Sequence, residues 1–148
     1  MKKFYTQVRV LFADTDAMGI VYHGNYLRWF EAGRNEFLRE IGFPYAELEK
    51  LPVWLPLAAA HLTYLAPARY DDLLEITTWP SRLTYATVRM NYEARQKESG
   101  ELLVKGYTDH AITDDQLKLI RAKKICPEVY ETIQKIVEEN EAEDAPQP

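Results

Sequence analysis

Two aspartates, a glycine and a histidine lie close together near the start of the chain, in the stretch DTDAMGIVYHGNY that runs from residue 14 to residue 26. Asp14 and Asp16 are separated by one residue, and His23 comes seven positions after Asp16. Carboxylates and imidazoles act as general bases, nucleophiles and metal ligands. Because a buried acid or imidazole needs a partner, this spacing predicts a reactive site on a loop between two elements.

The flanking segments predict a strand before this loop and a helix after it. Residues 5–13 alternate in part between apolar and polar side chains, as strands do. From about 25 to 41, apolar residues recur every three or four positions, and this period predicts one amphipathic helix. Arg34 interrupts its apolar face, and its stem can lie along apolar surface. The small residues Ala32 and Gly33 predict that another segment approaches the helix closely.

The rest of the chain predicts an antiparallel sheet followed by a second helix. After a short helical turn near 45–50, strands are expected at about 55–66, 73–83, 84–96 and 101–112, a further short strand at 117–122, and a last helix over 128–139. Turn residues separate these segments. One strand, one long helix and four or five strands make an α+β fold. We expect a sheet of five to six strands wrapped around one long central helix, plus a C-terminal helix.

Charge and composition narrow the function classes. Of the net charge of −5, residues 128–148 carry −6, so residues 1–127 are nearly neutral and have no basic stripe for nucleic acid. No apolar run is long enough for a membrane span, and the start lacks the apolar core of a signal peptide. With the single cysteine, Cys126, these features favour a cytoplasmic protein. Residues 1–127 form one predicted domain, followed by a helix and an acidic tail expected to be disordered from residue 140.

Other uses of the 14–26 stretch fit the residues less well. A calcium loop that starts at Asp14 would need glutamate at its twelfth position, where Asn25 stands. The remaining histidines, His61 and His110, have no paired ligands nearby, so no metal site is expected. No serine lies in a G-x-S-x-G context. The aspartates therefore act as general base or nucleophile, or they only shape the turn and cap the helix.

The same stretch resembles the signature of the hotdog-fold thioesterases, in particular the 4-hydroxybenzoyl-CoA thioesterase-like group and its YbgC-type acyl-CoA thioesterase branch. The signature aromatic–x–D–x–D–x–x–G–x–V–x–H/Y–x–x–Y is matched by Phe12, Asp14, Asp16, Gly19, Val21, His23 and Tyr26. The stretch Tyr64–Ile76 is similar to the family's strand–turn–strand, so the likeness covers about residues 5–127. It implies a hotdog fold and hydrolysis of an acyl thioester without metal or cofactor.

The resemblance implies a role for several residues. The catalytic carboxylate falls on Asp16 and the active-site histidine on His23, while Asp14 holds the loop. Asp16 either attacks the thioester carbonyl or activates a water, and His23 orients the thioester or stabilises the oxyanion. The residues expected to position the thioester are Gly19, Val53, Trp54 and Leu55. The residues expected to line the acyl pocket are Tyr26, Phe30, Leu62 and Tyr64.

The carrier and the assembly are also implied by the resemblance. Where the hydroxybenzoyl enzyme has a basic run for nucleotide phosphates, this chain has residues 84–87, without a cation. Candidate CoA contacts are therefore Arg82, Thr87 and Arg89, with the basic cluster at 118–124 as a further one. Acyl carrier protein is the alternative carrier. Family sites form between subunits, which implies a homodimer or homotetramer. A non-catalytic acyl-binding module and a hydratase-type hotdog enzyme are the alternatives to a thioesterase.

Overall fold

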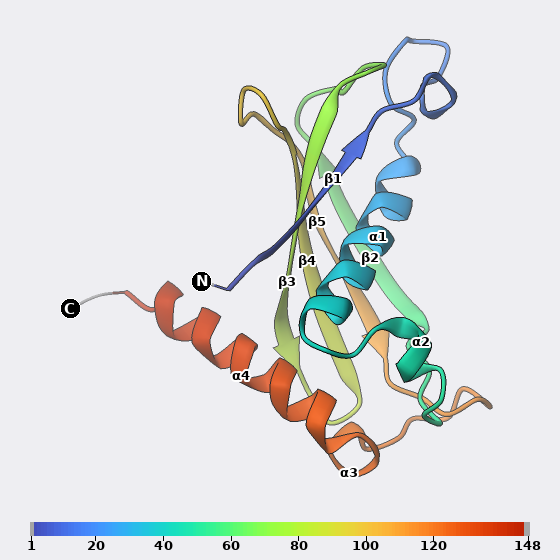
Figure 1. Ribbon diagram of the computed structural model, residues 1–148, viewed down its shortest axis with the longest axis vertical. Helices are drawn as coiled ribbons and strands as arrows, with labels where there is room; N and C mark the ends of the chain where they lie inside the picture. Colours follow the sequence, from blue (N-terminus) through green and yellow to red (C-terminus); the bar gives the residue numbers. More distant parts are fainter. Residues whose placement is uncertain (1, 147–148) are drawn as a thin grey trace.

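Five antiparallel strands form one sheet in the computed structural model of the chain, which describes residues 2–146 (Figure 1). The strands are β1 (Phe4–Arg9), β2 (Leu57–Tyr64), β3 (Leu73–Leu83), β4 (Thr87–Gln96) and β5 (Leu102–Ala111). Their order across the sheet is β1-β3-β4-β5-β2, so β1 and β2 are the two edges. Burial alternates along β4, as in a sheet with one face against a core and one face toward solvent.

The long helix α1 (Asn25–Glu40) packs against this sheet beside β1 and β3. Its buried residues are Tyr26, Trp29, Phe30, Gly33, Phe37 and Leu38. Their spacing of three and four positions is the predicted amphipathic pattern. The α+β architecture of an antiparallel sheet around one long helix is thereby confirmed. A 3-10 turn, η1 (Phe12–Asp14), precedes α1, and the short helix α2 (Tyr45–Leu48) follows it.

Gly33 is the point where α1 comes closest to the sheet. A Cβ atom added there would overlap the Thr78 hydroxyl and lie 3.2 Å from the Cγ2 atom of Ile76. Real Cβ atoms do not tolerate such an overlap, so a residue without a side chain is required at this position. The close approach predicted at this small residue is confirmed, and its partner is β3.

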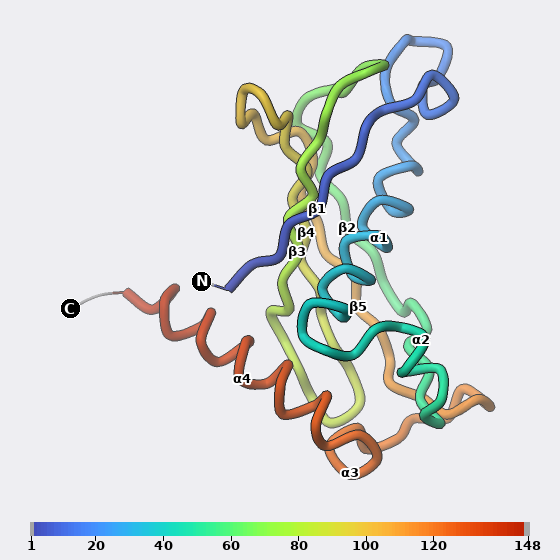
Figure 2. Tube along the Cα trace, viewed as in Figure 1, coloured from blue at the N-terminus to red at the C-terminus, as the bar shows by residue number. Residues whose placement is uncertain are grey.

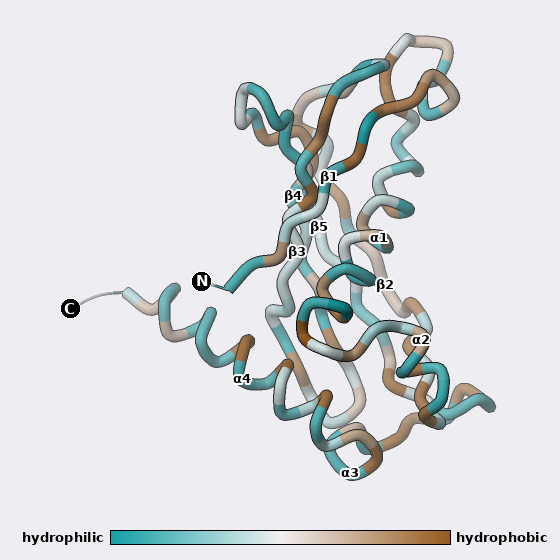
Figure 3. Tube along the Cα trace, in the orientation of Figure 1, coloured by the Kyte–Doolittle hydropathy of each residue, from teal (hydrophilic) through white to brown (hydrophobic). Residues whose placement is uncertain are grey.

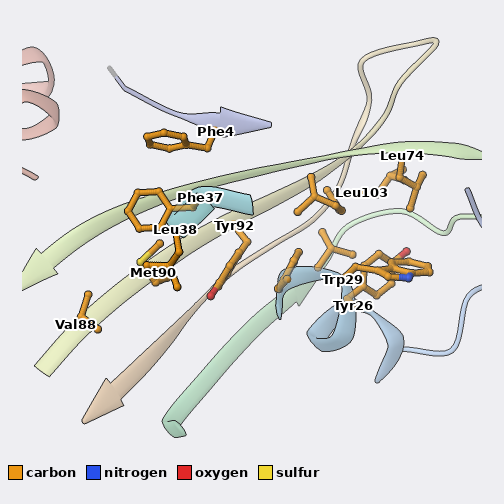
Figure 4. Close-up of a cluster of buried hydrophobic side chains, with 14 of the residues drawn as sticks. Phe4, Tyr26, Trp29, Phe37, Leu38, Leu74, Val88, Met90, Tyr92 and Leu103 are labelled. Atoms are coloured by element: carbon orange, nitrogen blue, oxygen red, sulfur yellow. The ribbon is translucent and has the colours of Figure 1, made fainter. Parts of the chain in front are cut away.

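The core between α1 and the sheet is rich in aromatic rings. Phe30 stacks on Tyr92 with ring centroids 4.5 Å apart, and Phe37 meets Phe4 edge to face at 4.8 Å. Such pairs contribute about 0.5–1.5 kcal/mol beyond their burial. Figure 4 shows Tyr92 between two groups of side chains, Tyr26 and Trp29 on one side and Phe37, Leu38, Val88 and Met90 on the other.

The C-terminal helix belongs to the same core. The short helix α3 (Ala122–Ile125) leads into α4 (Pro127–Asp144), which lies against β3. Its buried residues Ile133, Ile136 and Val137 are part of the main hydrophobic cluster. Figure 3 shows hydrophobic and hydrophilic residues alternating along this helix. None of the helices within residues 2–146 is both long enough and apolar enough to cross a membrane.

The disorder expected from residue 140 onward is wrong for the part of the tail that is described. The helix α4 continues to Asp144, and Asn140 is buried. The Asn140 side chain accepts a hydrogen bond from the Lys2 N–H at 2.6 Å and donates one to the Lys2 carbonyl at 3.2 Å. This two-point contact with the start of the chain orders an acidic segment whose composition favours disorder. Residues 147 and 148 lie outside the described residues.

The expected sixth strand does not form within residues 2–146. Where a strand was predicted over 117–122, Leu119 makes only a single β-bridge with Thr113. Leu117 has a φ of 62°, which interrupts extended backbone. The sheet therefore has the smaller of the two predicted strand numbers. The first strand is also shorter than expected and ends at Arg9, because the chain turns into η1 a few residues later.

Candidate active site

A compact loop between β1 and α1 carries the two aspartates and the histidine. Thr15 and Val21 form an antiparallel bridge, and the Asp16 N–H donates to the Ile20 carbonyl at 2.9 Å. At the tip of the loop, Gly19 has a φ of 76°, in the left-handed region that glycine favours. This small hairpin fixes the position of Asp16 relative to the start of α1.

Asp14 is buried and both of its carboxylate oxygens have partners. Oδ2 accepts a hydrogen bond from the Leu11 N–H at 2.8 Å, and Oδ1 lies 2.6 Å from the Arg28 guanidinium. Its backbone carbonyl also accepts a hydrogen bond from the Asn25 side chain. With these contacts Asp14 ties η1 to the first turns of α1, which is what a residue that holds the loop must do.

Asp16 lies in a different environment. It is half-buried, and its Oδ1 accepts only the N–H of Met18, at 2.9 Å. No ion pair engages this carboxylate within the described part of the chain. One oxygen is therefore held by the turn while the other is open to a reacting group. The two aspartates, which look alike in the sequence, are chemically distinct.

His23 is exposed at the base of the loop, directly before α1. Its ring lies 4.3 Å from the Tyr22 ring and 6.2 Å from the Tyr64 ring, measured between centroids. The Tyr64 hydroxyl donates to the His23 carbonyl at 2.9 Å. These contacts tie the histidine to the end of β2, and none of them engages a nitrogen of the imidazole. His23 can therefore donate or accept a hydrogen bond toward solvent or a ligand.

Large apolar side chains are exposed around the same loop. Phe12, Met18, Tyr64 and Leu65 all present more than a third of their surface to solvent. Figure 3 shows the hydrophobic character of the loop that precedes α1. An apolar surface of this kind at the rim of a polar site indicates that something binds over it.

The predicted acyl pocket is wrong for two of its four residues. Tyr26 and Phe30 are buried in the core, so they line no open space. Burial, together with the nearby Tyr64, raises the pKa of Tyr26 to about 12 and keeps its hydroxyl neutral. Leu62 and Tyr64 lie on the edge strand β2. The helical period identifies the apolar face of α1, but the sheet covers the part of that face where Phe30 lies.

A large cavity instead lies beside the second half of α1. Its volume is about 850 Å³, and it is lined from α1, α2, the segment before β2, and strands β4 and β5. The lining residues include Arg34, Leu38, Tyr45, Trp54, Leu55, Met90 and His110. The sequence did not predict this cavity. Its one signal was Arg34, a cation in the apolar stripe of the helix.

A continuous chain of hydrogen bonds runs along one wall of this cavity. The Arg34 guanidinium donates to the Tyr92 hydroxyl at 3.0 Å, which lies 2.7 Å from the Thr108 hydroxyl. The Thr108 hydroxyl lies 2.9 Å from Nε2 of His110, and Nδ1 of His110 lies 3.1 Å from the Leu55 carbonyl. The chain thus links the middle of α1 to the segment before β2.

The charge state of His110 and the Leu55 carbonyl together set the directions of these hydrogen bonds. Burial, followed by the positive charge of Arg34, lowers the pKa of this histidine and favours its neutral form. Because a carbonyl only accepts, Nδ1 of neutral His110 donates to Leu55 and Nε2 accepts from the Thr108 hydroxyl. The Thr108 hydroxyl then accepts from Tyr92, whose oxygen accepts from the Arg34 guanidinium.

The backbone donors predicted at 53–55 need a correction. The Val53 N–H already donates to the Leu51 carbonyl at 2.8 Å, and the Trp54 N–H donates to the Thr113 carbonyl at 2.7 Å. Of these three backbone N–H groups, that of Leu55 alone has no hydrogen-bond partner among residues 2–146. This segment follows α2, whereas the Asp16 loop precedes α1, so the two lie toward opposite ends of α1 (Figure 2). With 16 residues, α1 separates them by about 24 Å.

Of the three residues predicted to contact CoA, Arg82 remains open, and within residues 2–146 the cations of the basic cluster at 118–124 are also exposed without an ion pair. Arg89 makes two hydrogen bonds with Asp109, at 2.7 and 2.9 Å, and lies 3.9 Å from the centre of the Tyr107 ring. The Thr87 hydroxyl is hydrogen-bonded to the hydroxyl of Thr84. Both residues already have partners that stabilise the sheet and the β3–β4 turn, whereas Arg82 is exposed. In the described chain, no group of three or more potential metal ligands comes together.

Known thioesterases are similar to this protein over most of the chain. A family model described as the thioesterase-like superfamily matches residues 10–133. A putative acyl-CoA thioesterase of Bacillus subtilis, YneP, is 32% identical over 130 residues, which cover 87% of this chain and 94% of the relative. The acyl-CoA thioesterase YbgC of Haemophilus influenzae is 35% identical over 112 residues, covering 75% of this chain and 81% of the relative.

Solved structures agree with the sequence relatives. A DHNA-CoA thioesterase from Staphylococcus aureus superposes with a TM-score of 0.91 at 28% identity, covering 99% of this chain and 98% of that one. Because the match extends over the whole chain, it includes α4 and the segment that leads into it. The predicted hotdog fold is confirmed by this superposition.

Proposed function

Because the chain belongs to the thioesterase-like superfamily and is a thioester hydrolase, we propose that its substrate is an acyl-CoA and that Asp16 carries the reaction. One observation carries the assignment to Asp16. It is the carboxylate of the loop that keeps one oxygen open, while Asp14 uses both of its oxygens to hold the loop. A reacting carboxylate must reach the thioester carbon or the water that attacks it, and a buried, fully paired one cannot.

Two mechanisms use the open oxygen of Asp16. In the first, the carboxylate attacks the thioester carbonyl, the C–S bond breaks, and water then hydrolyses the mixed anhydride. In the second, the carboxylate takes a proton from a water that attacks the carbonyl. In both, the products are the free acid and the CoA thiol. The hydrogen bond from Met18 holds the carboxylate in position for either step.

His23 is the second functional residue of the proposed site. Its ring is placed by Tyr22 and Tyr64, and its nitrogens are not engaged by those contacts. A hydrogen bond from a ring N–H of His23 to the carbonyl oxygen becomes stronger as negative charge develops on that oxygen. The bond therefore stabilises the transition state more than the substrate. The N-terminus of α1, which has no side-chain cap, adds a favourable dipole on the same side.

The site is completed by a second copy of the chain. The edge strand β2 exposes five successive residues and carries neither proline nor a charged residue to block pairing. Antiparallel pairing of two copies along this edge would place Leu57 of one chain near Tyr64 of the other. The segment before β2 and the 850 Å³ cavity of one chain would then lie beside His23 and Asp16 of the other.

In this dimer the free Leu55 N–H of one chain becomes a backbone donor for the oxyanion beside Asp16 of the other. The exposed Phe12 and Met18 side chains would gain a cover at the same time. Arg82, on the end of the sheet that carries the cavity, is an open cation for the CoA phosphates, and the exposed basic cluster at 118–124 is a second candidate. Acyl carrier protein remains the alternative carrier, and a homotetramer would be two such dimers.

Thiol release from a panel of acyl-CoA thioesters tests the catalytic assignment. We expect Asp16→Asn to lower kcat by at least about 100-fold, since a carboxamide is neither base nor nucleophile. Its Oδ1 can still accept the Met18 N–H, so the variant should fold. Asp71→Asn is the matched control: Asp71 is exposed, its φ of 69° suits asparagine, and its carboxylate makes no hydrogen bond or ion pair with the loop among the described residues. A folded Asp16→Asn variant with wild-type turnover would refute the assignment and leave an acyl-binding module.

The dimer has its own test. We expect Ala60→Asp, near the middle of β2, to place two carboxylates close together across the interface and so to produce monomers by light scattering. Because the site is shared, the monomer should also lose activity. A monomeric variant with full activity would contradict the shared site while leaving Asp16 as the catalytic residue.

A further inference from the structure

We propose that Arg34 determines specificity, and that the cavity beside α1 accepts acyl groups whose far end carries an acceptor oxygen, in the first place a carboxylate. The proposal rests on the proposed function, because it assumes that the acyl group of a thioester enters this cavity. Beyond that function, the proposal names the class of acyl group that the enzyme prefers. The argument starts from the charge that the cavity contains and the partners that this charge lacks.

Arg34 is a half-buried cation without an acidic partner in the described chain. Its one hydrogen bond is to the neutral Tyr92 hydroxyl. Glu31 and Glu49 line the same cavity, yet neither forms an ion pair with it. A guanidinium has five N–H donors, and charged groups away from water are ordinarily paired. Arg34 is therefore short of acceptors on the side that faces the cavity.

The hydrogen-bond chain cannot supply the missing acceptor. The Tyr92 hydroxyl accepts a hydrogen bond from Arg34 and donates one to Thr108, and the last acceptor of the chain is the Leu55 carbonyl. His110 carries no negative charge in either protonation state, so it cannot balance Arg34. The acceptors along this wall are thus engaged by other members of the chain. The wall leaves the charge of Arg34 without a paired carboxylate, and the end of an acyl group can supply one.

Much of the remaining lining of the cavity is apolar. Leu38, Trp54, Leu55, Met90 and Val88 form much of the lining, and Figure 4 shows Leu38, Val88 and Met90 together on one side of Tyr92. Such side chains suit the hydrocarbon body of an acyl group. A charge-assisted hydrogen bond between a guanidinium and a carboxylate is stronger than a neutral hydrogen bond. A carboxylate therefore gains more here than a hydroxyl.

Two kinds of acyl group offer the required oxygen, and matched substrate pairs distinguish them. Adipyl-CoA against hexanoyl-CoA tests a terminal carboxylate, and 4-hydroxybenzoyl-CoA against benzoyl-CoA tests an aromatic hydroxyl. We expect the wild-type kcat/KM ratio to be about 10 to 100 for the first pair, as for a hydrogen bond to a charged group, and smaller for the second. A large ratio for the aromatic pair alone would assign the oxygen to a hydroxyl. Ratios near one for both pairs would overturn the proposal.

Substitution of Arg34 tests whether this residue produces the preference for adipyl-CoA over hexanoyl-CoA. Arg34→Met keeps an apolar stem without the charge and should bring the adipyl-to-hexanoyl ratio to about one, whereas Arg34→Lys should keep part of it. The matched control is Arg39→Met, which removes an exposed arginine of the same helix that pairs with Glu36. The control should keep the wild-type ratio. An Arg34→Met variant that keeps the wild-type ratio would refute the role of Arg34. If Arg34→Met does not fold, Arg34→Lys provides the test, and an unchanged ratio in that variant would refute the role as well.

The two proposals fail in different ways. If the substrates are hydrolysed but the two members of each pair react equally fast, the thioesterase stands and the role of Arg34 falls. If none of the four thioesters is hydrolysed, the proposed function falls. Calorimetric titration with adipate and hexanoate then still tests the cavity. Tighter binding of adipate, lost in Arg34→Met, would support the proposal, and equal binding of the two acids would refute it.

Discussion

The ion pair between Asp14 and Arg28 is the contact that separates the roles of the two aspartates, and it can be broken from either side. Asp14→Asn keeps an oxygen for the Leu11 N–H but removes the charge that Arg28 faces. Arg28→Met removes the guanidinium and keeps the stem. Together with the double variant, these substitutions make a thermodynamic cycle that isolates the pair.

The size of the coupling follows from how each partner is exposed. The Asp14 side chain is 7% exposed and the Arg28 side chain 62% exposed, so water screens one partner and not the other. Exposed pairs contribute about 0.2–1 kcal/mol, and hydrogen bonds to charged groups about 1.5–3 kcal/mol. We therefore expect a coupling of about 1 kcal/mol. Asp14→Ala also leaves the Leu11 N–H without its acceptor and should cost about 2–3 kcal/mol in all.

Urea unfolding, followed by tryptophan fluorescence at one fixed protein concentration, measures these free energies. Asp16→Asn is the comparison, and it should stay within about 0.5 kcal/mol of the wild type, because its turn hydrogen bond is kept. A coupling below about 0.3 kcal/mol would show that the pair does not hold the loop. A larger loss of stability for Asp16→Asn than for Asp14→Ala would reverse the roles argued for the two residues.

Three further perturbations test other parts of the molecule. Gly33→Ala should lower the free energy of unfolding by about 1–3 kcal/mol, because the new methyl overlaps the Thr78 hydroxyl; an unchanged urea midpoint would refute this close contact. Since the native pKa of His110 is lowered, the unfolded chain takes up a proton first as pH falls below about 6.5, and stability should fall there. His110→Gln should flatten that decline in urea midpoints, and an equal decline would refute the lowered pKa. Asn140→Ala removes both hydrogen bonds to Lys2 and should speed amide hydrogen exchange at the end of α4, whereas unchanged exchange would refute that anchor.

The element order and the strand-to-helix loop could be predicted because they follow from local patterns. The helical period after Asn25 identifies the buried face of α1, and the small residue Gly33 indicates the close approach of β3. Turn residues such as Ser99 and Gly100 separate the strands. Each of these signals acts within a few residues along the chain, so one sequence is enough to interpret it.

The cavity, and which of the N–H groups at 53–55 is free, could not be predicted, because neither follows from the local sequence. Phe30 and Arg34 lie on the same face of the helix, yet the sheet covers the first and leaves the second beside open space. The type of a side chain does not indicate whether the backbone N–H of Trp54 is free. In the structure this N–H donates a hydrogen bond to the Thr113 carbonyl. The helical end of the tail depends on Asn140 meeting Lys2, at the opposite end of the chain. All three depend on tertiary contacts rather than on residue pattern.

The hydrogen-bond chain connects the two proposals. Its first member, Arg34, faces the part of the cavity where we place the end of the acyl group, and its last member, Leu55, offers the free N–H that we assign to the oxyanion. Binding an anion at Arg34 would draw the guanidinium toward the ligand and weaken its bond to Tyr92, so the acyl end and the backbone donor are coupled through one wall. Tyr92→Phe breaks that chain and leaves Arg34 in place. Its effect on kcat, compared with its effect on the adipyl-to-hexanoyl ratio, therefore separates the positioning of Leu55 from recognition by Arg34.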